Sequence, residues 1–204
     1  MYKTPIIVFE GIEGSGKSLH INNVAKYLKK KRIKFIKIRE PGGNQNSEKI
    51  RKLILSNKSK FDKITDLLLY SAARNENIVN VIKDNFRKKI ILIDRFTDST
   101  VAYQHYGMGI NIKFIHFINK FLLKKIKVSF TFLHLVDSKN MKLRLVKRKN
   151  LNRYDKFKMA FYKRVQTGYI KLSKKNRKKY LRINSNLDIN NNKKIILNKI
   201  KEII

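Results

Sequence analysis

The octapeptide Gly11-Ile12-Glu13-Gly14-Ser15-Gly16-Lys17-Ser18 constrains the fold of this chain more than any other segment. It matches the phosphate-loop pattern G-x-x-x-x-G-K-[ST], and it lies between the apolar run 6–9 and the helix-like segment 19–31. Its glycines let the backbone turn tightly and aim several N–H groups at one anion. Lys17 adds a positive charge, and the hydroxyl of Ser18 is a ligand for Mg²⁺. The segment therefore predicts a strand–loop–helix unit that binds a phosphate chain.

The apolar pattern of the whole chain alternates short β-rich runs with longer helical segments, which predicts a parallel sheet with crossover helices. The expected strands are 6–10, 35–39, 90–94, 128–136 and 180–183. The expected helices are 18–31, 47–55, 64–86, 112–124, 138–148, 157–173 and 191–203. We therefore expect an α/β fold of the P-loop NTPase type, with three α/β/α layers around a five-stranded parallel sheet. The 204 residues are expected to form one domain.

Polar residues follow three of the expected strands, at the edge where ligands bind in such sheets. Asp94 ends a buried strand, where it could hold Mg²⁺ together with Ser18. Arg39 and Arg95 follow two different strands, and each guanidinium can grip a phosphate with two hydrogen bonds. A phosphate loop, a metal-binding acid and an anion clamp are the requirements of phosphoryl transfer.

The net charge of the chain is extreme, at +35 from 49 Lys and Arg against 14 Asp and Glu. Lysine, asparagine and isoleucine all have A/T-rich codons, and the lysines are spread along the chain. We therefore favour drift in an A/T-rich genome, with the charge tolerated on a solvated surface. The alternative is binding to nucleic acid or an anionic membrane, which requires a basic face rather than scattered lysines.

Other features of the sequence exclude several kinds of site. Cysteine is absent, which excludes disulfides and thiolate metal sites. The histidines share no ligand spacing, so we expect ordinary core or surface residues at His20, His105, His116 and His134. No apolar run approaches the roughly 20 residues that span a bilayer, and no leader precedes the first strand. These observations predict a soluble, cytoplasmic protein.

The motifs taken together resemble thymidylate kinase of the bacterial type. The resemblance rests on Phe9 to Ser18, on Arg39-Glu40-Pro41-Gly42-Gly43, on Tyr70-Ser71-Ala72-Ala73-Arg74, and on Asp94-Arg95-Phe96 followed by Asp98 to Gln104. It implies transfer of the γ-phosphate of ATP, with Mg²⁺, to dTMP, giving dTDP and ADP. It also implies a homodimer formed through helices, for which the apolar faces of 64–86 and 112–121 are candidates.

The resemblance implies a role for each matching residue. The loop Gly11, Ile12, Glu13, Gly14, Ser15, Gly16, Lys17 and Ser18 would bind ATP, with Ser18 and Asp94 holding the metal. The acceptor side would be formed by Arg39 and Arg95 on the dTMP phosphate, Tyr70 on the thymine face, Arg74 and Thr100 on the thymine edge, Tyr103 beneath the deoxyribose and Glu13 near its 3′-hydroxyl. Tyr70 departs from the family pattern, in which phenylalanine is usual.

A cation that stabilises the transferring phosphoryl group has to come from outside the phosphate loop, because none of residues 12–15 is basic. Residues 144–155 resemble the basic lid that supplies this cation in the bacterial type. We expect Arg148 and Arg153 to serve there, with Arg144 and Lys149 as the alternatives. The expected catalytic residues are therefore Lys17, Arg95, Arg148 and Arg153.

Two other classes of protein remain as alternatives. A GTP-dependent switch reads guanine with Asn-Lys-x-Asp, but segments 57–60 and 119–122 lack the aspartate. A nucleic-acid-binding protein would exploit the net charge, although the lysine distribution leads us to expect only non-specific attraction. Within the kinase class, the monophosphates of deoxyuridine, guanosine and cytidine compete with dTMP as the acceptor.

Overall fold

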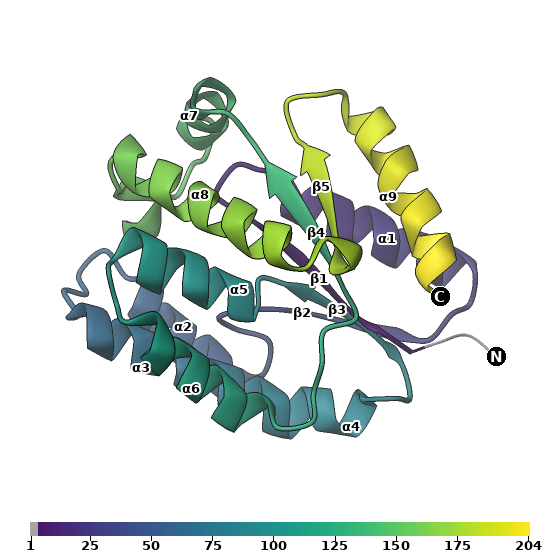
Figure 1. The fold of residues 1–204 in the computed structure, drawn as a ribbon, viewed down its shortest axis with the longest axis horizontal. Coiled ribbons are helices and arrows are strands. Elements are labelled where there is room, and N and C mark those ends of the chain that lie inside the picture. The colour runs from purple at the N-terminus through teal and green to yellow at the C-terminus, as the bar shows by residue number, and fades with distance from the viewer. Residues whose placement is uncertain (1–3) are drawn as a thin grey trace.

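Five short runs rich in isoleucine, leucine and phenylalanine form one parallel sheet in the computed structural model, which describes residues 4–204 (Figure 1). The strands are β1 (Ile6–Gly11), β2 (Phe35–Arg39), β3 (Ile90–Asp94), β4 (Phe130–Leu135) and β5 (Tyr180–Asn184). Their order across the sheet is β2-β3-β1-β4-β5, and every neighbouring pair is parallel. The predicted strands and sheet type are confirmed, with ends that differ by one or two residues.

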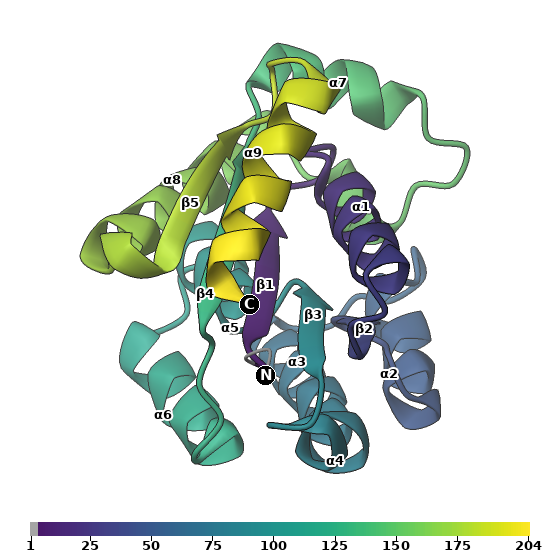
Figure 2. The same cartoon turned by 90° about the vertical axis from the view of Figure 1, so that its right-hand side faces the viewer.

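Helices connect the strands and cover both faces of the sheet (Figures 1 and 2). The α-helices are α1 (Lys17–Lys30), α2 (Gln45–Leu55), α3 (Lys63–Asn77), α4 (Lys83–Asn85), α5 (Thr97–Thr100), α6 (Ile112–Leu123), α7 (Ser138–Val146), α8 (Met159–Lys175) and α9 (Ile189–Ile203). Two π-helical turns, η1 (Ile78–Ile82) and η2 (Val101–Gly107), continue α3 and α5, and two 3₁₀ turns lie at η3 (Arg153–Lys156) and η4 (Arg177–Lys179).

The helical segment 97–107 is not among the elements expected from the sequence. Its threonines, valine and terminal glycine have low helix propensity, so the local pattern gives a weak signal. Packing against α8 stabilises this helical segment despite its low intrinsic propensity. A Cβ atom at Gly168 of α8 would lie 2.4 Å from Cδ2 of Tyr106, so the two segments approach closely because position 168 has no side chain.

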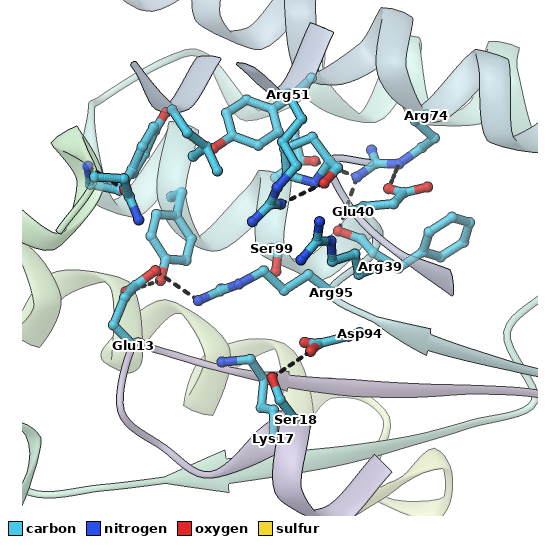
Figure 3. Close-up of a pocket in the computed structure, with 18 of the residues that line it drawn as sticks. Glu13, Lys17, Ser18, Arg39, Glu40, Arg51, Arg74, Asp94, Arg95 and Ser99 are labelled. Atoms are coloured by element: carbon cyan, nitrogen blue, oxygen red, sulfur yellow. Dashed lines mark hydrogen bonds and ion pairs between the residues drawn. The ribbon is translucent and has the colours of Figure 1, made fainter. Parts of the chain in front are cut away.

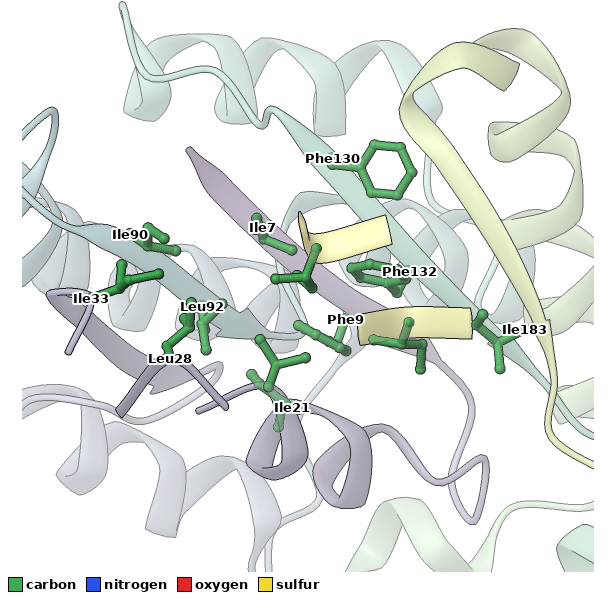
Figure 4. Close-up of a cluster of buried hydrophobic side chains, with 13 residues drawn as sticks. Ile7, Phe9, Ile21, Leu28, Ile33, Ile90, Leu92, Phe130, Phe132 and Ile183 are labelled. Carbon is green, nitrogen blue, oxygen red and sulfur yellow. The ribbon is translucent and has the colours of Figure 1, made fainter. Parts of the chain in front are cut away.

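The hydrophobic core on one face of the sheet lies beneath α1 and α9 (Figure 4). Alternate residues of the strands, including Ile7, Phe9 and Phe132, point toward this face and are fully buried. The other face carries the opposite set, and it is covered by η1, α6 and α8. Strands buried on both faces read as continuous apolar runs, which is why the sequence identified them.

The carboxyl ends of the central strands meet at one edge of the sheet, and this edge positions the candidate site. Strand β1 leads into the phosphate loop, β2 ends at Arg39 and β3 ends at Asp94. Cα pairing sets Arg39 beside Asp94, and Asp94 beside Phe9. Over residues 4–204, no helix has the length and apolar character needed to span a membrane.

Candidate active site

The phosphate loop adopts the tight turn that its glycines predict. Gly11 has a φ of 142°, and a Cβ atom there would lie 2.4 Å from the carbonyl oxygen of His134 on β4. Gly16 has a φ of 84° and stands at the N-cap of α1, so the first N–H groups of that helix face the loop. Arg144 of α7 donates to the Gly14 carbonyl at 2.8 Å and to the Ser185 carbonyl at 2.7 Å. Arg144 therefore ties the loop to the segment after β5.

Lys17 is buried inside this loop (Figure 3). Its Nζ donates to the carbonyl oxygens of Gly11 and Ile12 at 2.8 and 2.9 Å, and to Ser15 Oγ at 3.3 Å. Burial and, to a smaller extent, the nearby Arg95 lower the pKa of the Lys17 ammonium to about 7, against the opposing pull of Asp94. An anion such as a phosphate would compensate this burial, so the loop favours an anionic ligand.

Ser18 and Asp94 lie next to each other at the mouth of the loop. The Ser18 hydroxyl donates to Asp94 Oδ2 at 2.8 Å, and both side chains line the same cavity as Lys17. One hydroxyl and one carboxylate are hard oxygen ligands, which suit Mg²⁺ when a phosphate completes its coordination. Among residues 4–204 no cluster of three or more His, Cys, Asp or Glu could bind a metal by protein ligands alone.

Arg95 and Glu13 form an ion pair between the loop and the end of β3. Arg95 Nη2 lies 2.7 Å from Glu13 Oε1, and the Tyr103 hydroxyl donates to Glu13 Oε2 at 2.5 Å. The guanidinium of Arg95 also lies 5.0 Å from the centroid of the Tyr103 ring. Both oxygens of Glu13 are therefore occupied, and the three predicted side chains form one connected group.

Glu10 is a site residue whose role no sequence pattern indicated. Its buried carboxylate accepts from the backbone N–H of Phe96 at 2.8 Å and from the Ser99 N–H at 3.2 Å. It also accepts from the hydroxyls of Ser99 at 2.6 Å and Tyr169 at 3.0 Å. Arg95 has a φ of 67°, a conformation that is unusual for a residue with a side chain. Glu10 therefore holds the turn that presents Arg95.

Three arginines gather at the acceptor end of the cavity (Figure 3). Arg39 and Arg95 were expected there, and Arg51 of α2 joins them. Arg39 lies 3.3 Å from Glu48 with 54% of its side chain exposed, while Arg51 donates to the Pro41 carbonyl at 2.6 Å. No sequence signal distinguished Arg51, because it lies within a helix among other basic residues.

Arg74 is buried among protein partners. Its Nε donates to Glu40 at 2.8 Å and its Nη1 to Asn119 at 2.9 Å. Its Nη2 donates to the Phe96 carbonyl at 3.0 Å and to Thr100 Oγ1 at 2.9 Å. Because an arginine has five N–H groups, about one remains for a ligand. Arg74 therefore has a structural function beside the ligand contact expected of it.

The same region holds Gln104, whose amide was not among the expected site residues. Gln104 is 2% exposed and lines the cavity with Thr100 and Tyr70. Its Nε2 has no hydrogen-bond partner among the described residues. Because an unpaired buried amide is costly, this atom points to a ligand that carries an acceptor. The signal available in the sequence was its place at the end of the segment 98–104.

The lid (residues 147–158) connects α7 and α8, and its two arginines lie in different places. Arg148 lines the cavity, and its Nη1 lies 2.7 Å from Asp155 Oδ1. Arg153 does not line the cavity. Its guanidinium binds Asp66 of α3 and the Ile54 carbonyl of α2.

The lid also docks through Tyr154. Its hydroxyl donates to Asp66 at 2.8 Å, and its ring meets Tyr70 edge to face at 5.9 Å. We call Asp66, Arg153 and Tyr154 the lid latch. The latch fixes the lid against the same helix that carries Tyr70 and Arg74.

One cavity of about 190 Å³ brings most of the expected side chains together. The expected residues that line it are Glu13, Lys17, Ser18, Arg39, Tyr70, Arg74, Asp94, Arg95, Thr100, Tyr103 and Arg148. A phosphate loop stands at one end, and an aromatic and amide-lined recess stands at the other. The arrangement is suited to two ligands whose anionic ends meet between Lys17 and the three arginines.

Comparison with known proteins gives one consistent family. A family model described as thymidylate kinase matches residues 9–196. The chain is 36% identical over 198 residues to thymidylate kinase of Sulfurihydrogenibium sp. (strain YO3AOP1), covering 96% of each chain. It is 40% identical over 169 residues to thymidylate kinase of Thermosipho africanus (strain TCF52B), covering 82% of this chain and 84% of that protein. The crystal structure of thymidylate kinase from Ehrlichia chaffeensis superposes with a TM-score of 0.80 at 31% identity, covering 98% of this chain and 99% of that one.

Proposed function

This chain belongs to the thymidylate kinase family, and we propose that it transfers the γ-phosphate of ATP to dTMP, giving dTDP and ADP. The observation that carries the proposal is the single cavity with a phosphate loop at one end and a base recess at the other. The acceptor phosphate attacks directly, so the reaction needs positioning and charge stabilisation more than a strong base.

ATP would bind with its phosphates in the loop of residues 11–18. The N–H groups of the loop and of the first turn of α1 would surround the phosphates, and the Lys17 ammonium would contact the outer ones. Ser18 and Asp94 would hold Mg²⁺, a proposal supported by their 2.8 Å contact beside Lys17. When bound, Mg²⁺ neutralises phosphate charge.

The dTMP phosphate would bind between the arginines at the carboxyl ends of β2 and β3. Arg39 and Arg95 supply bidentate donors, and Arg51 adds a third positive charge from α2. Arg95 is oriented by Glu13, whose carboxylate also accepts from Tyr103. The Tyr103 ring would lie beneath the deoxyribose, and crowding there would favour deoxynucleotides.

The thymine ring would lie against Tyr70, with its polar edge toward Arg74, Thr100 and Gln104. Donors from Arg74 and Gln104 match the carbonyl oxygens of thymine or uracil. Cytosine carries an amino group in place of O4. This hydrogen-bond donor would face the donors of Arg74 and Gln104, which disfavours cytosine. The unpaired Nε2 of Gln104 is the strongest support for this part of the proposal.

An assay of ADP release with dTMP, dUMP, dCMP and dGMP at fixed MgATP tests the function. We expect the highest kcat/KM with dTMP, and dTDP as the product. A preference for dCMP or dGMP, or ATP hydrolysis without an acceptor product, would contradict the proposal.

Replacement of Gln104 by leucine should selectively weaken the acceptor side. We expect kcat/KM for dTMP to fall about 10- to 100-fold, because an interaction with a buried amide is lost. The KM for ATP should stay within about twofold. Steady-state kinetics with each substrate varied checks this. An equal change in both KM values would show that Gln104 supports the fold rather than the base.

We also propose a homodimer that pairs the exposed faces of α3 and α6. Phe117 and Phe121 are 67% and 66% exposed on α6, and Phe114 lies in the same stripe. Ile64 and Leu68 are exposed on α3, which packs beside α6 (Figure 1). Contiguous exposed apolar side chains of this kind mark an interface.

The variant with both Phe117→Asp and Phe121→Asp should therefore sediment as a monomer, because two charges would be buried at the interface. Ile195→Asp, at an exposed apolar position on α9, is the matched control and should leave the dimer intact. Sedimentation velocity at several concentrations checks both variants. A wild-type monomer, or a double variant that remains dimeric, would exclude this surface.

A further inference from the structure

The edge of the sheet opposite the cavity is strongly basic. Four connections lead into the amino ends of β2, β3, β4 and β5, at residues 29–34, 87–89, 124–127 and 174–179. They carry sixteen cations and no acid, namely Lys29, Lys30, Lys31, Arg32, Lys34, Arg87, Lys88, Lys89, Lys124, Lys125, Lys127, Lys174, Lys175, Arg177, Lys178 and Lys179. We call this set the basal face.

The cations of the basal face are free to bind a partner. All of them are exposed except Lys89, which is half-buried. The ion pairs of the described chain involve other arginines and Lys199, so none of the sixteen is neutralised by an acid. No ion pair within residues 4–204 therefore neutralises these cations, although Glu202 of α9 lines a hollow together with Arg177 and Lys178.

The opposite edge of the sheet has a different charge pattern. The connections that leave the carboxyl ends of β1, β2, β4 and β5 each carry an acid, at Glu13, Glu40, Asp137 and Asp188. Codon drift alone would distribute lysine over both edges. Attraction of nucleotide substrates would concentrate cations around the cavity, not behind it. Neither cause explains why the basal face carries cations alone.

The charge of the basal face is enough to neutralise a short segment of nucleic-acid duplex. Neighbouring strands lie about 4.8 Å apart, so the four spacings from β2 to β5 span about 19 Å. A duplex carries one negative charge per about 1.7 Å, or about eleven over that length. The sixteen cations are sufficient to neutralise such a segment.

The composition of the basal face favours nucleic acid over lipid. Within the four connections the only apolar side chains are Ile33 and Ile126, and both are buried in the core. The exposed Phe121, which adjoins Lys124 and Lys125, belongs to the proposed dimer surface. Proteins that bind membranes at their surface usually add exposed apolar side chains that enter the lipid. We propose that the basal face binds the phosphate backbone of duplex nucleic acid without sequence preference. This interaction leaves the cavity free and is independent of the proposed function.

A charge-matched pair of variants tests the proposal. The basal variant carries Lys174→Gln, Lys175→Gln, Lys178→Gln and Lys179→Gln. The control variant carries Lys49→Gln, Lys52→Gln, Lys58→Gln and Lys60→Gln, at exposed positions on α2 and the segment after it. Each variant loses four charges, so any effect of net charge alone is the same in both.

Binding is measured by the fluorescence anisotropy of a labelled DNA duplex over a series of KCl concentrations. For the basal variant we expect affinity to fall at least about tenfold at about 0.1 M salt. Its log–log salt slope should flatten by about 3.6, because each of the four lost phosphate contacts contributes about 0.9. The control variant should change less than about twofold, and both should keep the wild-type rate of ADP release.

Equal weakening in the two variants would overturn the proposal, because it would assign binding to net charge. Tighter binding to phosphatidylserine vesicles than to the duplex would overturn it in favour of a membrane. If the basal variant unfolds early in thermal denaturation, Lys124→Gln, Lys125→Gln and Lys127→Gln together replace it. That triple variant should flatten the salt slope by about 2 to 3.

Discussion

Replacement of Lys17 by methionine should lower kcat/KM for ATP by about 10³-fold, the largest effect expected of any single substitution here. Lys17 is the one cation within the phosphate loop, and its ammonium can follow the charge that moves with the phosphoryl group. Methionine keeps the length of the side chain and removes the charge. The rate of ADP release with dTMP and MgATP varied separately checks the prediction.

The loss of activity should not be accompanied by a loss of stability. Burial lowers the pKa of Lys17 from 10.5 to about 7, so between these values the unfolded chain binds a proton that the folded chain does not. The contribution of Lys17 to the free energy of unfolding therefore rises with pH across this window, and it is absent in Lys17→Met. Lys26→Met, an exposed position on α1, is the control and should keep full activity. A Lys17→Met enzyme with wild-type kinetics would refute the proposed donor site.

Replacement of Arg148 by alanine should lower kcat by about 10²- to 10³-fold, with a smaller change in either KM. Arg148 is the lid arginine that lines the cavity, and Asp155 holds its guanidinium at 2.7 Å. A cation that contacts the transferring group acts mainly in the transition state, so its loss appears in kcat. Single-turnover measurements with saturating substrates separate this chemical step from product release.

Arg153→Ala is the informative comparison with Arg148→Ala, because the guanidinium of Arg153 is bound to Asp66 in the lid latch. We expect Arg153→Ala to lower kcat by about tenfold through a loosened lid. Asp66→Asn should act in the same direction, and the double variant should be less than additive because the two residues are in contact. If Arg148→Ala and Arg153→Ala both retain full rate, the catalytic cation does not come from the lid.

The fold was predictable because its signals are local and agree with one another. Each strand is a short apolar run buried on both faces. Strand β1 leads directly into the phosphate-loop motif, which is typical of a strand–loop–helix unit. The helical segment 97–107 was missed because its stability comes from packing against α8, which no local pattern records. The π-helical turn η1 was likewise read as part of one long helix.

The site was predictable where a motif carries its own chemistry, and less so where contacts join distant segments. Lys17, Asp94 and Arg95 follow from the loop and the strand ends. Glu10 and Gln104 belong to the same motifs, but their functions depend on which side chains fold back onto them. The position of Arg153 depends on Asp66, which is 87 residues away in the chain. Such pairings are properties of the tertiary structure.

The basal face shows how lysines spread along a sequence can gather in space, and the origin of the net charge stays a prediction. The lysines are spread along the sequence, and this favoured a scattered surface charge. Because every crossover in a parallel sheet returns to the same edge, basic segments at regular intervals meet in space. Lysines that are evenly spaced along the sequence of such a fold can therefore form one basic patch on its surface.

The wall behind the phosphate loop consists of two stacked histidines. The rings of His20 and His134 lie 5.4 Å apart, and burial holds the pKa of His134 at about 3, with His20 adding repulsion. Below about pH 6.5 the histidines of the unfolded chain bind protons that the buried pair in the folded chain does not bind. The free energy of unfolding therefore decreases on acidification. Mild acid should therefore lower the stability of the fold that carries the proposed ATP site.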